Sequence, residues 1–185
     1  MDKKVNLSEY IHPKTEILFV ALNVPENSNK NAHWFTNNLS FWNLLFRSGI
    51  ITQPILNKLE GDETVFGCTK INFKNWSIGV TDLNRKIVKA KSINVEVTSK
   101  DVKRIMDILK IREVSKLCLM HSKVGEAFRN FASEIQFNSN RYRKIGQWKN
   151  TEIFEVPFHN ASIADKEKYY TMLIQKYGSV NKKGE

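Results

Sequence analysis

The chain has 185 residues, of which 41% are hydrophobic and 26% charged, proportions that are typical of a globular protein with its own core. No apolar run approaches the roughly 18 residues that a membrane span needs, which excludes a spanning helix from our expectations. The net charge of +10 favours a polyanionic partner, most commonly nucleic acid, although a basic proteome or a basic tail without such a partner gives the same excess.

Strand and helix patterns alternate along the chain. In chain order we first expect a strand at 15–22, helices at 40–48 and 52–60, and a helix capped by Ser99. A strand at 114–120 follows, and then a helix that carries Val124, Phe128 and Phe131. The last two elements are a strand at 151–157 and a helix that begins at Ser162 and ends at Gly178. The expected face of 52–60 carries Ile55, Leu56 and Leu59. This alternation predicts an α/β fold with a largely parallel sheet.

Polar residues follow two of the predicted strands. Asn23 ends the apolar run ILFVAL, and the segment FHNAS follows the strand at 151–157. Because parallel sheets bind ligands beyond the carboxyl ends of their strands, both places are candidate sites. For Asn23 the alternative is a turn residue that only ends a buried strand.

Common cofactor and metal motifs are absent from the sequence. We find no glycine-rich phosphate loop, no G-x-S-x-G and no H-E-x-x-H, and the four histidines lack metal-ligand spacing. Cys68 and Cys118 lie far apart, which predicts reduced thiols, and two cysteines cannot ligate a four-cysteine cluster. We therefore expect neither a metal nor a cofactor.

Four segments resemble, in order and spacing, motifs of one family over roughly 14–178. They read ILFVALNVP followed by HWFTNNLSFWNLLFRSGII, then SIGVTDLNRKIVKAKSINVEVTSKDVKRIM, LCLMHSKVGEAF, and TEIFEVPFHNASIADKEKYYTML. This set resembles the uracil-DNA glycosylase superfamily, above all its mismatch-specific uracil/thymine branch. The resemblance implies a three-layer αβα fold and a DNA glycosylase that excises a deaminated or mismatched base from single- or double-stranded DNA by hydrolysis, in base excision repair.

The chain departs from the family pattern at several positions. Ala21 stands where the family has Gly, and Val24-Pro25 stands where it has Pro-Gly. Proline has no backbone N–H, so a donor to the base is lost at Pro25. In the second motif either His159 or Asn160 aligns with the family's functional residue, depending on whether Phe158 is an insertion.

The resemblance also assigns roles. Asn23 is expected to position the attacking water, and His159 to donate a hydrogen bond to the leaving base. Both could instead be turn or loop residues. For the base pocket, the candidate stacking ring is Phe35 or its neighbour Trp34, and the further candidates are Asn38, Asn160 and Asp82. The candidates for DNA contact are Ser162, at a helix N-terminus, and Ile163, as a wedge. The aromatic pair could also pack as core.

Two alternatives remain open at this stage: a nucleic-acid-binding protein of the same fold without catalysis, and an unrelated α/β enzyme acting on a small anion. We expect a single domain over 1–185 with a short basic tail at 179–185, and a monomer in the cytoplasm, or in the nucleus of a eukaryote. The N-terminus lacks the apolar core of a signal peptide, which predicts that the protein is not secreted.

Overall fold

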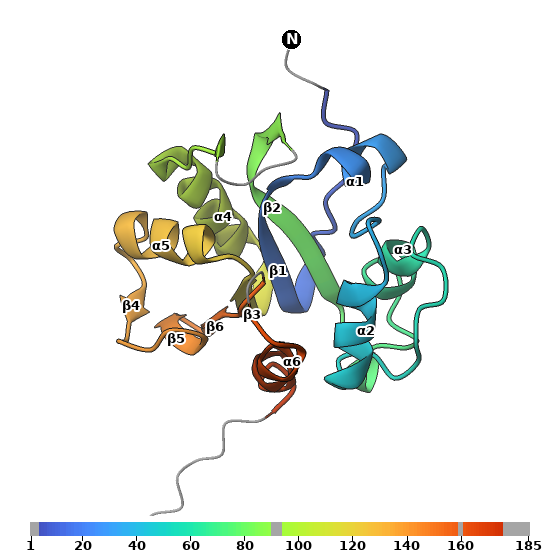
Figure 1. The fold of residues 1–185 in the computed structure, drawn as a ribbon. Coiled ribbons are helices and arrows are strands. Elements are labelled where there is room, and N and C mark those ends of the chain that lie inside the picture. Colours follow the sequence, from blue (N-terminus) through green and yellow to red (C-terminus); the bar gives the residue numbers. More distant parts are fainter. Residues whose placement is uncertain (1–3, 90–93, 159–160, 176–185) are drawn as a thin grey trace, which may run out of the picture.

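A mostly parallel sheet forms the middle layer of the protein. The computed structural model describes residues 4–89, 94–158 and 161–175, and within them the strands are β1 (Lys14–Val24), β2 (Ile78–Val88), β3 (Glu113–Leu119), β4 (Gln136–Phe137), β5 (Arg143–Trp148) and β6 (Thr151–Glu155). Their order in the sheet is β2-β1-β3-β6-β5-β4 (Figure 1). The first four in this order run parallel, and β5 and β4 run antiparallel to their neighbours.

The predicted strands are confirmed as β1, β3 and β6, with ends that shift by one or two residues. Their apolar runs are continuous because the strands are covered on both faces. Along β1, Phe19 packs in one hydrophobic cluster and the next residue, Val20, in the other, and both are fully buried. A covered parallel sheet therefore fits the sequence pattern.

Helices cover both faces of this sheet. On one side lie α2 (Ser40–Arg47), α3 (Gly61–Val65) and α6 (Ile163–Thr171), with α1 (Glu26–Asn31) following the end of β1; on the other side lie α4 (Ser99–Ile111) and α5 (Ser122–Phe131) (Figure 1). A short 3₁₀ turn, η1 (Phe73–Asn75), precedes β2. The α/β fold with three αβα layers, expected from the sequence, is confirmed.

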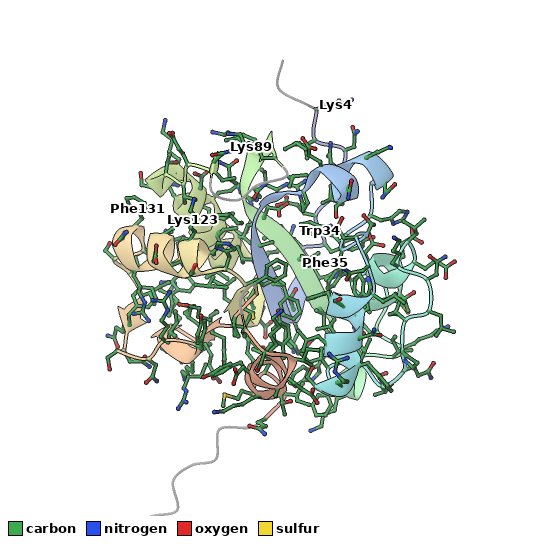
Figure 2. All side chains as sticks on the ribbon, in the orientation of Figure 1. Lys4, Trp34, Phe35, Lys89, Lys123 and Phe131 are labelled. Carbon is green, nitrogen blue, oxygen red and sulfur yellow. The ribbon has the colours of Figure 1, made fainter. Side chains whose placement is uncertain are left out.

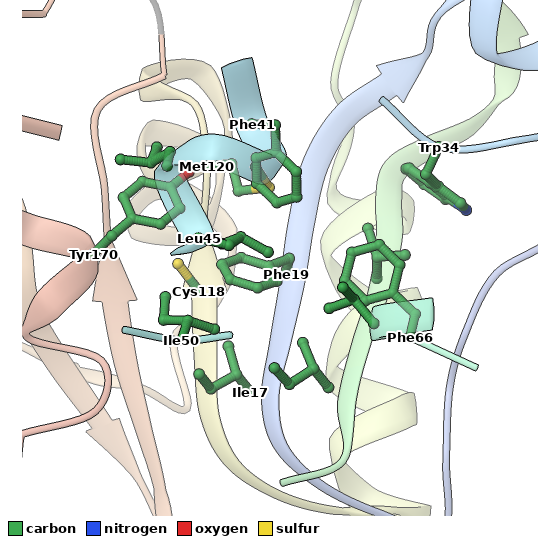
Figure 3. Close-up of a cluster of buried hydrophobic side chains, with 14 of the residues drawn as sticks. Ile17, Phe19, Trp34, Phe41, Leu45, Ile50, Phe66, Cys118, Met120 and Tyr170 are labelled. Atoms are coloured by element: carbon green, nitrogen blue, oxygen red, sulfur yellow. The ribbon is translucent and has the colours of Figure 1, made fainter. Parts of the chain in front are cut away.

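The layer of α2 and α6 has an aromatic core (Figure 3). The Phe19 ring meets Phe41 edge-on at 5.9 Å and stacks near Tyr170 at 6.1 Å between centroids. Phe41 meets Trp42 at 5.1 Å. Each fully buried large side chain contributes about 1.5–3 kcal/mol through burial alone, so these rings fix both helices on the sheet.

Strand β2 was not anticipated from the sequence, because polar residues interrupt its apolar pattern. The N-terminal segment binds two of them, since the Thr81 hydroxyl donates to the Glu9 carboxylate and Arg85 forms an ion pair with Glu9 at 3.7 Å. Glu9 forms an ion pair with Arg104 of α4 at 2.7 Å, and Tyr10 pairs antiparallel with Val80 through two backbone hydrogen bonds of 3.0 Å. A Cβ at Gly79 would come within 2.4 Å of the Tyr10 carbonyl oxygen, so glycine permits this close approach.

The helix predicted at 52–60 is wrong. This stretch forms bends and turns, and Leu56 and Leu59 are 86% and 40% exposed. The Asn57 side chain accepts the backbone N–H of Leu59, a local bond that competes with helix formation.

Two further helix boundaries differ from expectation. Thr98, not Ser99, is the N-cap of α4, and its backbone N–H donates to Asp101 Oδ2 at 2.8 Å. The helix expected to carry Val124, Phe128 and Phe131 is confirmed as α5, of which Phe131 is the last residue and is 45% exposed. The helix begun by Ser162 ends at Thr171, and Gly178 lies outside the described residues.

Candidate functional site

A cavity of about 630 Å³ opens at the carboxyl ends of the parallel strands. It is lined by residues from the ends of β1, β3 and β6, from the segment between α1 and α2, and from one face each of α2 and α6. A cavity of this size accommodates a ligand as large as a nucleoside. Its position agrees with the general rule for open parallel sheets.

Asn23 lines this cavity and is held in one orientation. Its side-chain nitrogen donates to the carbonyl oxygens of Val24 at 3.2 Å and of Lys89 at 3.0 Å. Because both partners only accept hydrogen bonds, the other atom of the amide, Oδ1, is identified as the oxygen. Within the described part of the chain no donor bonds this oxygen. The cavity therefore has a fixed, unpaired acceptor at the end of β1.

The two candidate stacking rings differ in how they are held. Trp34 is 1% exposed, and its indole N–H donates to the Ser8 carbonyl at 2.7 Å. Phe35 is half-buried and has a left-handed backbone conformation with φ of 55°. One face of the Phe35 ring is taken by Phe41, at 3.7 Å between centroids. Both rings touch the cavity (Figure 2 labels them), but Trp34 is committed to the core and Phe35 is the better placed for stacking.

One face of α2 supplies polar groups to the cavity. Asn43 is half-buried there, and its amide has no hydrogen-bond partner within the described ranges. Arg47, one turn further along, forms an ion pair with Glu167 of α6 at 3.4 Å. Asn38, in the loop before α2, also lines the cavity, and its Oδ1 accepts the Ser40 backbone N–H at 2.8 Å. Asn38 is thus partly committed to starting the helix, whereas the Asn43 amide is available to a ligand.

The ends of β3 and α6 form the floor. His121 follows β3 and lines the cavity, and its Nδ1 accepts the Lys123 backbone N–H at 3.1 Å. A neutral ring with this bond carries its proton on Nε2. Met120 and Tyr170, both labelled in Figure 3, also line the cavity. The Tyr170 hydroxyl is fully buried, has no partner among the described residues, and its pKa is raised well above the usual value by burial.

The remaining candidates occupy the rim or lie elsewhere. Ile163 lines the cavity and is 65% exposed, as a wedge residue must be. Ser162 caps α6 by accepting the Asp165 backbone N–H at 3.0 Å, and it also donates to the Asp165 carboxylate. His159 and Asn160 lie outside the described residues.

Asp82 is separated from the cavity lining. It is fully buried in β2, where Arg85 Nη1 donates to its carboxylate at 3.1 Å. Burial raises the pKa of this carboxyl to about 7, an effect that Arg85 and Arg104 oppose and Glu9 reinforces. Asp82 therefore belongs to the ionic network that anchors the N-terminal segment, and it is not placed to touch a base held in the cavity.

Cations surround the mouth. Arg47, Lys89 and Lys166 all belong to the lining, and Lys89 lies at the end of β2 (Figure 2). The Lys89 amine donates to the Asn94 carbonyl at 2.7 Å. Together they can attract an anionic ligand such as a phosphate.

Sequence reasoning missed Asn43, His121 and Tyr170. His121 carried a signal, since it follows a buried strand as Asn23 does, but His159 was the one histidine considered for a role other than metal binding. Within the described residues, no cluster of three or more His, Cys, Asp or Glu side chains could hold a metal ion. In the same part of the chain, every helix is too short or too polar to cross a membrane.

Comparison with known proteins adds no assignment: no family model matches the chain, and no curated protein matches it. The function is therefore inferred from the residues of the site.

Proposed function

We propose that this protein is a DNA glycosylase that hydrolyses the N-glycosidic bond of a deaminated or mismatched base, acting as a monomer in the cytoplasm or nucleus. The observation that carries the proposal is the fixed oxygen of Asn23, which has no donor among residues 4–89, 94–158 and 161–175, in a cavity at the carboxyl ends of the parallel strands. The resemblance of four segments to uracil-DNA glycosylases and the positive charge support the same function.

The proposed chemistry follows from the charges of the transition state. As the glycosidic bond breaks, positive charge develops on the sugar and negative charge on the departing base. Asn23 Oδ1 would accept a hydrogen bond from water and hold it near the sugar carbon. Its amide is too weak a base to take a full proton, but a cationic sugar needs only an oriented water. No metal or cofactor is required for this step.

Groups on the opposite side of the base would stabilise the leaving anion. His159 has this role in the proposal, and Asn160 has it in the alternative alignment. One preorganised donor of this kind is worth about 3 kcal/mol of barrier.

We propose that apolar side chains and side-chain amides of the cavity lining recognise the base. The duplex must release the base into the pocket, which costs a few kcal/mol and is least costly at a mismatch. Phe35 would stack on the extruded base, and Asn38, Asn43 or Asn160 would bond its edge. Ile163, exposed at the rim, would fill the gap left in the stack.

A panel of oligonucleotides tests this proposal directly. Duplexes and single strands containing uracil, hypoxanthine, xanthine or mismatched thymine are incubated with the protein and scored for abasic sites. Release of at least one base supports glycosylase activity, and intact DNA throughout the panel contradicts it.

A second function, nucleic-acid binding without catalysis, is favoured by one observation. Pro25 lines the cavity directly after β1 and lacks the backbone N–H that another residue would offer the base. Salt-dependent DNA binding together with intact bases would support this second function.

A further inference from the structure

The loop between β4 and β5 lies at the same end of the strands as the cavity, namely the carboxyl ends of the parallel strands. Strand β5 runs antiparallel to β6, so its first residue, Arg143, pairs with Glu155 at the carboxyl end of β6. The cavity lining continues from this end through Pro157 and Phe158. The β4–β5 loop therefore borders the region proposed to bind DNA, although none of the four segments that resemble the family contains this loop.

This loop has a set shape. The Arg129 guanidinium of α5 donates to the carbonyl oxygens of Asn138 at 3.0 Å and Asn140 at 2.6 Å. The side-chain amides of the same two asparagines both donate to the Lys144 carbonyl, at 3.2 and 3.3 Å. These hydrogen bonds connect the two sides of the loop at its base, so they fix the position of its tip.

The tip has an unfavourable backbone conformation. Tyr142 and Arg143 have φ values of 66° and 60°, in the left-handed region that side chains with a Cβ rarely adopt. Each such residue costs about 1–2 kcal/mol. Strain of this kind persists where surrounding contacts enforce it, and it concentrates at functional sites.

The strained tip brings two tyrosines together from distant parts of the chain. The Tyr142 ring meets Tyr169 of α6 at 5.3 Å between centroids, with the ring planes at 45°. Arg141 lies 6.0 Å from the Tyr142 ring, and Lys168 lies 5.5 Å from the Tyr169 ring. Both rings are only partly buried, and the neighbouring cations, with Arg143, are exposed. The result is a surface that combines aromatic rings with positive charge.

This surface continues from the cavity along α6. Lys166 lines the cavity, and Tyr169 follows three residues later. Three residues of helix rise about 4.5 Å, so Tyr169 lies about one helical turn beyond Lys166. The tyrosine pair therefore lies next to the part of α6 that lines the cavity.

We propose that Tyr142 and Tyr169, with Arg141, Arg143 and Lys168, form a subsite for single-stranded DNA next to the cavity. Aromatic rings stack on any unpaired base and the cations pair with its phosphates, which is how sequence-tolerant single-strand sites are built. A duplex hides its bases in the stack, so it offers phosphates but no free base to these rings. The subsite rests on the proposed function in one respect, namely that the strand is DNA.

Binding of undamaged oligonucleotides tests the subsite separately from catalysis. Fluorescence anisotropy with a short labelled oligothymidine measures single-strand affinity, and a duplex of the same length measures backbone contact alone. We expect Tyr142→Ala to weaken single-strand binding about tenfold and duplex binding about twofold or less. Tyr142→Phe keeps the ring and should bind as wild type. Arg143→Ala, a second variant, should weaken both.

Arg112→Ala is the matched control. Arg112 is an exposed arginine directly before β3, at the amino-terminal end of that strand and away from the cavity. Its loss should leave the affinities for single strand and duplex within about twofold of wild type. Urea unfolding of each variant shows that it is folded.

The possible outcomes separate the two proposals. Unchanged single-strand binding by folded Tyr142→Ala overturns the subsite, and so does an equal loss for single strand and duplex. Preference for RNA of the same sequence overturns the assignment to DNA. Tenfold selective loss, in a protein that releases no base from the damage panel, supports the subsite and contradicts glycosylase activity.

Discussion

The side-chain amide of Asn23 donates to the backbone carbonyl of Lys89 at 3.0 Å, which joins the end of β1 to the end of β2. This bond selects the orientation of the whole amide, because its nitrogen must face the carbonyl and its oxygen must face away. A residue at a strand end thus contributes both a structural tie and an oriented acceptor in the cavity.

Replacing Asn23 by Ala should lower single-turnover base excision at least tenfold, while DNA affinity changes little. Water positioning acts in the transition state, whereas phosphate contacts hold the DNA. Rapid-quench assays and anisotropy measure the two quantities. Asn31→Ala, in α1 and away from the cavity lining, is the control. Full excision by Asn23→Ala would remove this residue from the mechanism.

His159→Ala should slow excision about a hundredfold, from the usual worth of a donor to a developing anion. The loss should be smaller for a base whose anion leaves readily, because less charge then needs stabilisation. Rates on two substrates of different leaving-group acidity measure this. If His159→Ala stays active and Asn160→Ala is inactive, Asn160 has the role instead.

Asn43→Ala should reduce excision about tenfold without changing the affinity for undamaged DNA. The half-buried amide lines the cavity, and its loss removes hydrogen bonds that form only with an extruded base. Single-turnover rates over the damage panel measure the effect base by base. Asn130→Ala, exposed on α5, controls for the loss of an asparagine. An equal loss in both variants would contradict a recognition role.

Tyr170→Phe should raise the free energy of unfolding by about 1 kcal/mol. The hydroxyl is buried without a partner in the described residues, so removing it ends a desolvation cost while the ring keeps its packing. Urea unfolding measures the change, and the m-value should stay constant. A destabilised variant would mean that the hydroxyl is bonded in solution, for example to a buried water.

Asp82 should make the protein less stable as the pH rises from about 4 to about 7. Burial raises the folded-state pKa from 3.8 to about 7, so in this window the folded chain holds a proton that the unfolded chain has lost. The slope for one proton is at most about 1.4 kcal/mol per pH unit. Unfolding at several pH values, for wild type and Asp82→Asn, isolates it. Identical pH profiles would show that Asp82 is ionised throughout the window.

The sequence predicted the middle of the sheet because apolar runs such as ILFVAL leave few other solutions. It did not predict β2, because Asp82 is buried against Arg85, and Arg85 in turn pairs with Glu9 of the N-terminal segment, a distant partner that cannot be read from local periodicity. The helix at 52–60 failed for the opposite reason, since a local asparagine bond outweighed the apolar spacing.

The candidate site divides in the same way. Asn23 was recognisable from its place after a strand, and the structure brings it together with Phe35, Asn38 and Ile163 around one cavity. Asn43 lies among the apolar residues of α2, and the sequence alone did not show which face of this helix lines the cavity. Asp82 shared a motif with the family pattern, yet its partners draw it into the anchor of the N-terminal segment.

The pairing of Tyr10 with Val80 has a consequence for association between molecules. β2 is the outermost strand of the sheet, and an outermost strand with free backbone groups recruits strands from other chains. Tyr10 takes the Val80 N–H and C=O, and the ion pair between Glu9 and Arg104 holds it there. Residues 4–10 thus protect this side of the sheet against pairing with other chains, and removing them would expose the outer side of β2 and take away the Ser8 carbonyl that holds Trp34.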